Sequence, residues 1–209
     1  MSQTTRETNE AGDPARQHTE HGRERKQQIL DAALELFADR GYAATRIADI
    51  CRTAGVAKGL FYWYFDTKAD VFADLVRAMR LELRRAQAAA MDPEVDARTR
   101  IGQGAEASVH FMARHAAWFR LLDVERSDDD VRETLREGAD VYLHDVRRLV
   151  EEGQASGVIH DADPELLAVG VLGAVSAYSN WIRSTPLDDR PDVGEVASFV
   201  HTWVATALA

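Results

Sequence analysis

Apolar residues recur with helical spacing along most of the chain, and no stretch shows the strict apolar and polar alternation of a β-strand. The first such segment carries Ile29, Ala33 and Phe37 on one helix face and stops before Gly41, which suits a left-handed C-cap. The expected helices cover about 24–40, 46–53, 57–64, 67–89, 96–114, 116–125, 128–153, 164–184 and 193–208. The pattern therefore predicts an all-α fold.

Two short helices with a glycine between them lie near the N-terminus. Thr45 is a suitable N-cap for the first helix, and Gly55 tolerates the positive φ that a tight turn needs. Cys51 offers a small side chain where the two helices would touch. The apolar residues expected to lock them together are Ile47, Ile50, Val56 and Phe61. The pattern predicts a helix-turn-helix whose second helix, 57–64, enters the major groove of duplex DNA.

The distribution of charge supports this assignment, although the net charge of −10 by itself argues against a nucleic-acid partner. Residues 23–68 carry 8 basic and 6 acidic side chains, whereas residues 69–209 carry 15 basic and 25 acidic ones. All lysines lie in the first segment, as Lys26, Lys58 and Lys68. We therefore expect DNA to meet that segment alone.

Composition places the chain among ordinary globular proteins, since 45% of its residues are hydrophobic and 29% are charged. The single cysteine and the lack of a signal peptide or an apolar run long enough to span a bilayer predict a cytoplasmic protein. We expect a flexible N-terminal arm over 1–22, a helix-turn-helix domain over 23–68 and a helical domain over 69–209. The long helix that opens at Thr67 and Asp70, a capping-box pair, would join the two domains.

A specific resemblance runs from Arg25 to about Leu75. It rests on Gly41-Tyr42, Thr45, Ile47, Asp49-Ile50, Ala54-Gly55-Val56, Lys58-Gly59, Phe61-Tyr62-Trp63-Tyr64-Phe65 and Lys68. This sequence resembles the signature of the tetracycline-repressor (TetR) family. The resemblance implies a DNA-binding N-terminal domain and a helical domain for effector binding and dimerisation.

The resemblance also implies which residues meet DNA. The implied phosphate contacts are Thr45, Tyr62, Tyr64 and Lys68. The residues implied to face the groove are Ala57, Lys58, Gly59 and Leu60, with Arg46 and Trp63 as additional contacts. Ala57 departs from the family pattern, which commonly has serine or threonine there, so a hydroxyl that could cap the helix and reach phosphate is missing.

Structural explanations compete with these functional ones. Phe61 and Phe65 lie four apart on one helix face and are interpreted as core residues, whereas the tyrosine hydroxyls need partners and favour phosphate. Trp63 fits either interpretation. Cys51 could sense oxidants, but a lone cysteine at a small-residue core position favours inert packing.

The last two helices are the expected homodimer seam. Helix 164–184 carries a face of small residues that allows a second helix to approach closely: Gly170, Gly173, Ala174 and Ala177. Helix 193–208 adds apolar residues at core spacing: Val196, Val200, Trp203 and Val204. A symmetric dimer would hold two recognition helices about 34 to 36 Å apart on a palindromic operator. Packing within one subunit would explain Trp203 equally well.

An effector would bind where polar groups converge among bulky apolar ones in the middle helices. Two clusters fit: the first is His110, Phe111, Arg114, His115, Trp118, Phe119 and Leu122, and the second is Tyr142, Asp145, Tyr178, Asn180 and Trp181. These residue types favour a small apolar or aromatic effector. Histidines five apart do not share a helix face, and Gly102 and Gly104 do not form a phosphate loop, so we expect neither a metal nor a cofactor.

The preferred hypothesis is a ligand-responsive transcriptional regulator, a repressor, that binds DNA as a homodimer. An all-helical enzyme using His144, Asp145 or the acidic triplet at 128–130 is the first alternative, but the sequence offers it no nucleophile motif and no metal spacing. A protein-binding helical adaptor is the second alternative. It leaves the basic N-terminal segment and its aromatic run unexplained.

Overall fold

The computed structural model describes residues 14–124 and 129–209, with side chains described for 21–122 and 140–209. The described residues form nine α-helices, one short 3-10 turn and no strand. The helices are α1 (Pro14–Arg40), α2 (Ile47–Thr53), α3 (Lys58–Tyr64), α4 (Lys68–Ala90), α5 (Ala97–Arg114), α6 (Ala116–Val124), α7 (Asp129–Ala155), α8 (Pro164–Ser184) and α9 (Val193–Ala207), with the turn η2 (Leu187–Asp189) before α9. The all-α prediction is confirmed.

Helix ends agree with the predicted ones to within about two residues, except at α1. That helix begins at Pro14, before the predicted start near residue 24, and residues 1–13 lie outside the described part of the chain. The capping box that opens α4 is confirmed, because Thr67 Oγ1 accepts from the Asp70 backbone N–H at 3.1 Å and Asp70 Oδ2 accepts from the Thr67 N–H at 2.8 Å.

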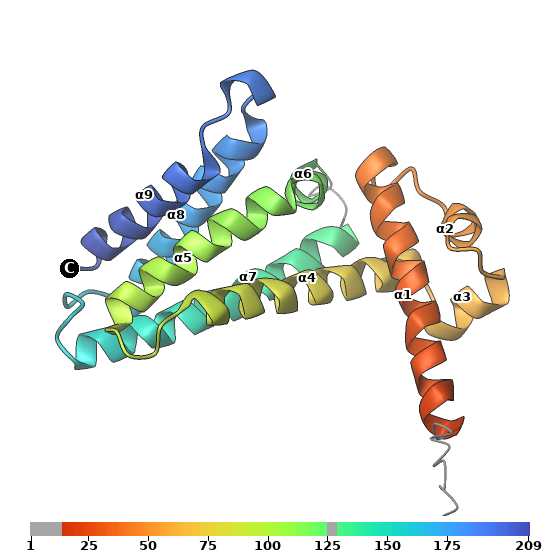
Figure 1. Cartoon of the computed structure of the whole chain (residues 1–209), viewed down its shortest axis with the longest axis horizontal. Helices are drawn as coiled ribbons and strands as arrows, with labels where there is room; N and C mark the ends of the chain where they lie inside the picture. Colours follow the sequence, from red (N-terminus) through yellow and green to blue (C-terminus); the bar gives the residue numbers. More distant parts are fainter. Residues whose placement is uncertain (1–13, 125–128) are drawn as a thin grey trace, which may run out of the picture.

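The helices form two bundles joined by α4 (Figure 1). Helices α1, α2 and α3 form one end of the molecule, and α5, α7, α8 and α9 form the other. Helix α4 begins beside α1 and runs into the second bundle between α5 and α7. Helix α6 stands between the two ends and packs against α1 as well as α5.

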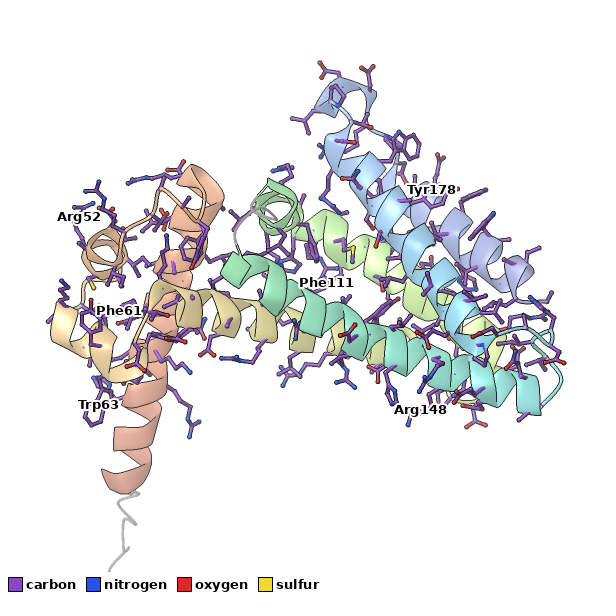
Figure 2. The ribbon with its side chains drawn as sticks, turned by 180° about the vertical axis from the view of Figure 1, so that it is seen from behind. Arg52, Phe61, Trp63, Phe111, Arg148 and Tyr178 are labelled. Atoms are coloured by element: carbon purple, nitrogen blue, oxygen red, sulfur yellow. The ribbon has the colours of Figure 1, made fainter. Side chains whose placement is uncertain are left out.

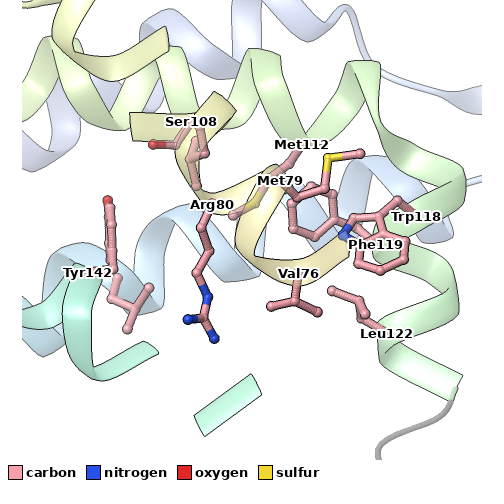
Figure 3. A pocket seen from close by; sticks show the side chains of 11 residues that line it. Val76, Met79, Arg80, Ser108, Met112, Trp118, Phe119, Leu122 and Tyr142 are labelled. Atoms are coloured by element: carbon pink, nitrogen blue, oxygen red, sulfur yellow. The ribbon is translucent and has the colours of Figure 1, made fainter. Parts of the chain in front are cut away.

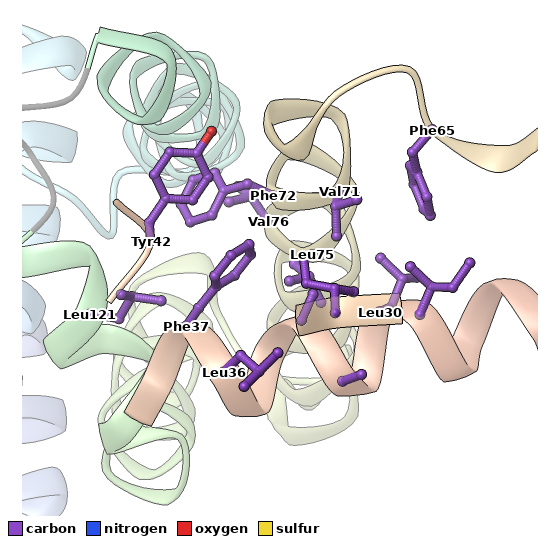
Figure 4. Close-up of a cluster of buried hydrophobic side chains, with 14 of the residues drawn as sticks. Leu30, Leu36, Phe37, Tyr42, Phe65, Val71, Phe72, Leu75, Val76 and Leu121 are labelled. Atoms are coloured by element: carbon purple, nitrogen blue, oxygen red, sulfur yellow. The ribbon is translucent and has the colours of Figure 1, made fainter. Parts of the chain in front are cut away.

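The buried apolar residues of the first bundle, which we call the N-terminal core, include six aromatic side chains (Figure 4). The Phe72 ring centroid lies 6.2 Å from that of Phe37, 5.2 Å from that of Tyr42 and 5.6 Å from that of Trp118. Trp118 and Leu121 belong to α6, so this core extends beyond the first three helices. The N-terminal unit is therefore clamped to the rest of the protein by α4 and α6 together.

Aliphatic residues from α5, α7, α8 and α9 make up the second set, which we call the C-terminal core. Helix α5 lies at its centre and approaches α9 closely. At Gly102 an added Cβ would lie 2.7 Å from His201 Cδ2 and 3.1 Å from the His201 carbonyl oxygen, so this contact requires a residue without a side chain. His201 Nδ1 also lies 2.8 Å from Glu106 Oε2, which links the same two helices.

Candidate nucleic-acid interface and ligand cavity

The turn between α2 and α3 has the geometry that its sequence predicts. Gly55 has a φ of 65°, and the Val56 N–H donates to the Cys51 carbonyl at 3.0 Å. Cys51 is buried, and burial raises the pKa of its thiol above the ordinary value. A thiol in that environment stays protonated and packs as a small apolar group, in agreement with the inert interpretation.

One side of helix α3 packs against the N-terminal core, and the other side is exposed (Figure 2). Phe61 is completely buried and points into the N-terminal core, while Trp63 is 80% exposed and points away from the body. Tyr62 is 46% exposed, and Lys58 Nζ lies 5.8 Å from the centroid of its ring. We call Ala57, Lys58, Gly59, Tyr62 and Trp63, all exposed, the outer face of α3.

The remaining residues predicted to face DNA around α3 lie at the edge of this face. Leu60 and Tyr64 are half-buried, and the Tyr64 hydroxyl lies beside α1, 3.5 Å from where a Cβ on Gly22 would stand. Arg46 is exposed at the N-cap of α2. Ala57 is the N-cap of α3 and makes no side-chain cap, as expected from its methyl group.

Thr45 does not have the environment predicted for a phosphate contact. Its side chain is 2% exposed, and its hydroxyl donates to the Gly41 carbonyl at 2.8 Å, with the Leu36 carbonyl at 3.3 Å. It is also not the N-cap of α2, because that helix begins at Ile47 after Arg46. Thr45 instead ties the loop to the C-terminal end of α1, where helix carbonyls lack intrahelical donors.

Lys68 is likewise turned inward, toward the loop before α2, and its predicted contact with phosphate stays a prediction. Its Nζ donates to the carbonyls of Tyr42 at 2.6 Å and Thr45 at 3.1 Å, and it lies 4.1 Å from the centroid of the Tyr42 ring. The ammonium group has three donors, and carbonyls of the loop before α2 occupy at least two of them. Lys68 therefore fixes the loop that positions the helix-turn-helix.

One cation of the N-terminal segment, Lys26, forms an ion pair with a carboxylate of the same chain and is not available to DNA on its own. Lys26 Nζ lies 2.6 Å from Asp74 Oδ2, and Arg77 pairs with the same carboxylate. Burial opposes the charged form of Asp74, but these two cations outweigh it and lower the pKa of the carboxyl. In the segment from α2 to α3 the exposed cations are Arg46, Arg52 and Lys58, of which Arg52 pairs with Asp49.

A cavity of about 200 Å³ lies between α4, α5, α6, α7 and α8 (Figure 3). Four of the predicted effector-binding residues line it: Trp118, Phe119, Leu122 and Tyr142. The prediction missed the residues that line it from other positions: Val76, Met79, Arg80, Leu83, Ser108, Met112 and Leu172. The α4 residues could have been found, since they continue the apolar stripe of that helix toward its middle.

The other predicted effector residues do not line this cavity. Asp145 lines a smaller cavity of about 40 Å³ with Tyr142, and its carboxylate lies 3.0 Å from Arg84. Phe111 stacks on His115, with 4.4 Å between ring centroids. The rest lie on other sides of their helices: His110, Arg114, Tyr178, Asn180 and Trp181. Consecutive residues of a helix point in different directions, so residues that are neighbours in sequence cannot all face the same cavity.

The residues of the alternative enzyme hypothesis do not gather into a site. His144 is exposed and lies 3.5 Å from Arg147 Nη2, and Asp145 forms the ion pair with Arg84. The acidic triplet at 128–130 lies outside the residues whose side chains are described. The described part of the chain therefore offers this hypothesis no arrangement of acid, base and nucleophile.

A short chain of hydrogen bonds joins α4 to α5 and reaches the cavity wall at Ser108. Gln87 Nε2 on α4 donates to Ser108 Oγ on α5 at 2.9 Å, and Ser108 Oγ donates to the Gly104 carbonyl at 2.6 Å. Tyr142 on α7 lines the cavity together with Ser108. Burial, with the nearby charge of Asp145, raises the pKa of Tyr142, so the phenol is neutral near pH 7.

An exposed apolar surface covers the outside of α8 and α9. Leu166 is 70% exposed and Phe199 52%, while Trp203 is 45% exposed. At Gly170 and Gly173 an added Cβ would meet no described atom within 4 Å. Of the predicted face of small residues, Gly170, Gly173 and Ala177 are exposed, whereas Ala174 is buried in the C-terminal core. Val196, Val200 and Val204 are likewise buried within the subunit.

Helix α8 is the most apolar long helix that the structure describes by the measure of a membrane span. By length and apolar composition it could cross a membrane, and it is the one helix of the described residues that could. A third of its most apolar window is buried, including Val171, Val175 and Ile182 in the C-terminal core. Such a test is also passed by helices of soluble proteins that pack in a core, so it is weak evidence for a span.

Comparison with known proteins agrees with this two-part organisation. Residues 29–75 match the family model of bacterial regulatory proteins of the tetR family, and residues 94–195 match the tetracyclin repressor-like C-terminal domain. The two matches cover the helix-turn-helix with the start of α4, and most of the helices around the cavity.

Individual proteins are similar over most of their length. The HTH-type transcriptional regulator TtgR of Pseudomonas putida is 37% identical over 207 residues, which cover 92% of this chain and 94% of that protein. The HTH-type transcriptional repressor SCO4008 of Streptomyces coelicolor is 32% identical over 171 residues, covering 81% and 83%. The solved structure of a fatty acid degradation regulator from Bacillus halodurans shares the fold, with a TM-score of 0.75, 24% identity and coverage of 88% and 96%.

Proposed function

The chain belongs to the TetR family of bacterial regulatory proteins, and from this premise we propose that it is a repressor that binds a palindromic operator as a homodimer and responds to a small effector. Proteins of this family are DNA-binding transcriptional regulators, not enzymes. The proposal places the protein in the cytoplasm, and a similar protein that carries the name of repressor supports the sign of regulation.

The outer face of α3 is the proposed DNA-contacting surface. Lys58 and the exposed Tyr62 offer a cation and a hydroxyl for phosphate or base edges, and Trp63 offers a large apolar surface for thymine methyl groups or sugars. Arg46 adds a second cation from the start of α2. Few cations stand there, so we expect a modest salt dependence for each subunit.

The exposed apolar surface of α8 and α9 is the proposed homodimer interface. Monomeric soluble proteins rarely leave a contiguous apolar patch of this kind in water, and aromatic residues such as Phe199 and Trp203 are typical of interface centres. The open glycine face of α8 lets the partner helix approach closely. A two-fold axis there would present two copies of α3 to two half-sites.

Shared residues between the cavity and the N-terminal core carry the proposed effector response. Val76, Trp118 and Leu122 line the cavity and also belong to the core that seats the helix-turn-helix. A ligand that repositions Trp118 would press on Phe72, whose ring centroid is 5.6 Å away, and through it on Phe37 of α1. Effector and DNA would then compete through a coupling of about 1 to 3 kcal/mol, equal in both directions.

Fluorescence anisotropy tests the DNA-binding surface. The protein should bind duplex from its own upstream region more tightly than scrambled duplex, with affinity that falls from about 50 to 200 mM salt. Replacing Lys58 with alanine should weaken binding and flatten the log–log salt slope by about two for the dimer, one for each subunit. Arg148→Ala, an equal charge loss at an exposed residue of α7, is the matched control and should change neither.

If Lys58→Ala and Arg148→Ala bind alike, the outer face of α3 is not the contact surface. Failure of the unmodified protein to select any duplex from genomic fragments, with and without cell extract, would refute the DNA-binding proposal itself.

Analytical ultracentrifugation tests the dimer. Trp203→Glu places a charge in the proposed interface and should shift the protein from dimer to monomer. Val141→Glu changes an exposed apolar residue on α7 in the same way and should leave the dimer intact. The opposite pattern would move the interface away from α8 and α9.

A further inference from the structure

We propose that Lys58 reads a guanine in each half-site of the operator, and that the ring of Tyr62 contacts the methyl group of a thymine about one or two base pairs away. The inference deepens the proposed function and rests on it, because it assigns base specificity to the outer face of α3. It is carried by the exposure of this face, by the few hydrogen-bonding groups that it offers and by the distance between the Lys58 ammonium group and the Tyr62 ring.

The outer face of α3 offers few groups that can hydrogen-bond to a base edge. Ala57 and Gly59 have no polar side-chain atom, and at Gly59 an added Cβ would meet no described atom within 4 Å. Tyr62 and Trp63 have one polar group each, on a large ring. Lys58 is the one charged residue of α3, and its ammonium group carries three donors. Base recognition through hydrogen bonds therefore depends on Lys58 more than on any other residue of this face.

The chemistry of the ammonium group selects the base. Lysine can donate hydrogen bonds but cannot accept them, so it needs acceptors on the base edge. In the major groove guanine presents two acceptors, O6 and N7, whereas adenine has its N7 acceptor beside an amino group that would repel an ammonium group. Cytosine presents a donor, and thymine presents one acceptor beside a methyl group. Guanine is therefore the base that Lys58 should prefer.

The Lys58 ammonium group is positioned by an aromatic ring and not by a carboxylate. Within the described part of the chain no acidic side chain pairs with it, and its Nζ lies 5.8 Å from the centroid of the Tyr62 ring. The two residues are four apart, so they share one face of the helix. The Tyr62 ring is itself in contact with the buried Phe61, with 5.5 Å between ring centroids. We therefore expect the cation and the ring to approach DNA together.

This distance sets the spacing of the two contacts. Successive base pairs are stacked about 3.4 Å apart, so 5.8 Å corresponds to roughly one or two base steps. The apolar group that a base presents in the major groove is the thymine methyl, and an aromatic ring packs against it. Tyr62 is 46% exposed, so its ring can make such a contact. We therefore expect a thymine near the guanine in each half-site.

The other exposed cations of the helix-turn-helix lie at α2. Arg46 is the N-cap of that helix, and Arg52 lies in its last turn and pairs with Asp49. In a helix-turn-helix the first helix crosses the phosphate backbone, while the second lies in the groove. This arrangement gives phosphates to the cations of α2 and leaves Lys58 for a base edge.

Selection from a random duplex library by the full-length protein, followed by fluorescence anisotropy, tests the inference. Each selected half-site should contain one fixed guanine. Changing this G·C pair to A·T in one half-site should weaken binding about tenfold, the effect of one good base contact. In Lys58→Ala the two duplexes should bind within about twofold of each other, whereas Lys58→Arg should keep the preference. Arg46→Ala is the matched control and should weaken binding to both duplexes alike, so that the ratio of about ten remains.

Base analogues separate a base contact from a phosphate contact. Because a cation in the groove also displaces counterions, the salt slope responds to either role. A guanine analogue without the N7 acceptor, 7-deazaguanine, should weaken binding of the unmodified protein about threefold and leave that of Lys58→Ala unchanged. Uracil in place of the thymine lacks the methyl group and should weaken binding about fourfold. That loss should persist in Tyr62→Phe and in Trp63→Ala and should disappear in Tyr62→Ala.

Each result is a ratio between two duplexes on one protein, so it does not depend on the fraction of the protein that is folded. A selected half-site without a fixed guanine, or a G·C preference that survives in Lys58→Ala, would overturn the assignment of Lys58. A uracil effect that survives in Tyr62→Ala, or one that disappears in Trp63→Ala, would overturn the assignment of Tyr62.

The proposed function can survive the failure of this inference. Specific DNA binding in which Lys58→Ala weakens all duplexes alike would make Lys58 a phosphate contact, which rejects the inference and leaves the regulator intact. Failure to select any duplex, with and without cell extract, would reject the proposed function and the inference with it.

Discussion

The two cores of this protein contain different kinds of apolar side chain. The N-terminal core packs rings of Phe37, Tyr42, Phe61, Phe72 and Trp118 at fixed distances and angles, while the C-terminal core is aliphatic. Ring contacts are directional and orient the helices that carry them, whereas valine and alanine fill space with less directional demand. Because ring contacts need particular residues at particular positions, the DNA-binding end carries a sequence signature. The aliphatic core of the ligand-binding end allows more variation in its residues.

Phe72→Ala should have the largest effect, because this ring touches α1, the loop before α2 and α6. We expect a loss of about 3–5 kcal/mol in the free energy of unfolding and a matching loss of DNA binding. Ile182→Val in the C-terminal core should cost about 0.5–1.5 kcal/mol and leave DNA binding intact. Urea denaturation at one fixed protein concentration measures both, and equal costs would remove the distinction between the cores.

Lys68→Met and Lys58→Met compare an inward-facing lysine with an exposed one in the N-terminal unit. The substitution leaves the Tyr42 and Thr45 carbonyls without their charged donor, so we expect a loss of about 2–3 kcal/mol. Lys58→Met at the exposed face of α3 should change stability by less than about 0.5 kcal/mol while weakening DNA binding. A stable Lys68→Met protein that fails to bind DNA would return Lys68 to the phosphate role.

The same substitution at two glycines should have opposite signs in the two regions. Gly102→Ala would force apart α5 and α9 at the His201 carbonyl, and we expect a loss of about 1–2 kcal/mol. Gly59→Ala meets no described atom and should raise the free energy of unfolding by about 0.5–1 kcal/mol through helix propensity. Thermal or urea unfolding distinguishes them, and a stable Gly102→Ala protein would show that the helix contact is soft.

The smallest expected effect concerns pH. The pKa of Asp74 is lowered in the folded protein, so its pairs with Lys26 and Arg77 stabilise the fold above about pH 4 and lose that effect as pH falls through the lowered pKa. Asp74→Asn should cost about 1 kcal/mol at pH 7 and less at pH 2. Urea titrations at the two pH values measure the difference, and an equal cost at both would show that the ion pairs contribute nothing.

The helices and the helix-turn-helix could be predicted from the sequence because both depend on local chemistry. Periodicity, the Thr67 cap and the left-handed turn at Gly55 are written within a few residues of where they act. The hydrogen bonds of Thr45 and Lys68 were not predicted, because Thr45 bonds to the end of α1 and Lys68 to a loop 23 to 26 residues away. Seven of the eleven described residues of the cavity wall were missed for the same reason, since Val76, Ser108 and Leu172 meet only after α4, α5 and α8 have packed.

The amino-acid sequence by itself determined which segments are helical, which end carries the basic charge and which signature the chain belongs to. Tertiary structure alone decided which polar groups are already occupied, because a hydroxyl or an ammonium group has few hydrogen bonds to give and its nearest partner can lie anywhere in the chain. It turned Thr45 and Lys68 inward, left Trp63 outside, joined Gln87 to Ser108, and placed Ser108 and Tyr142 on one cavity wall.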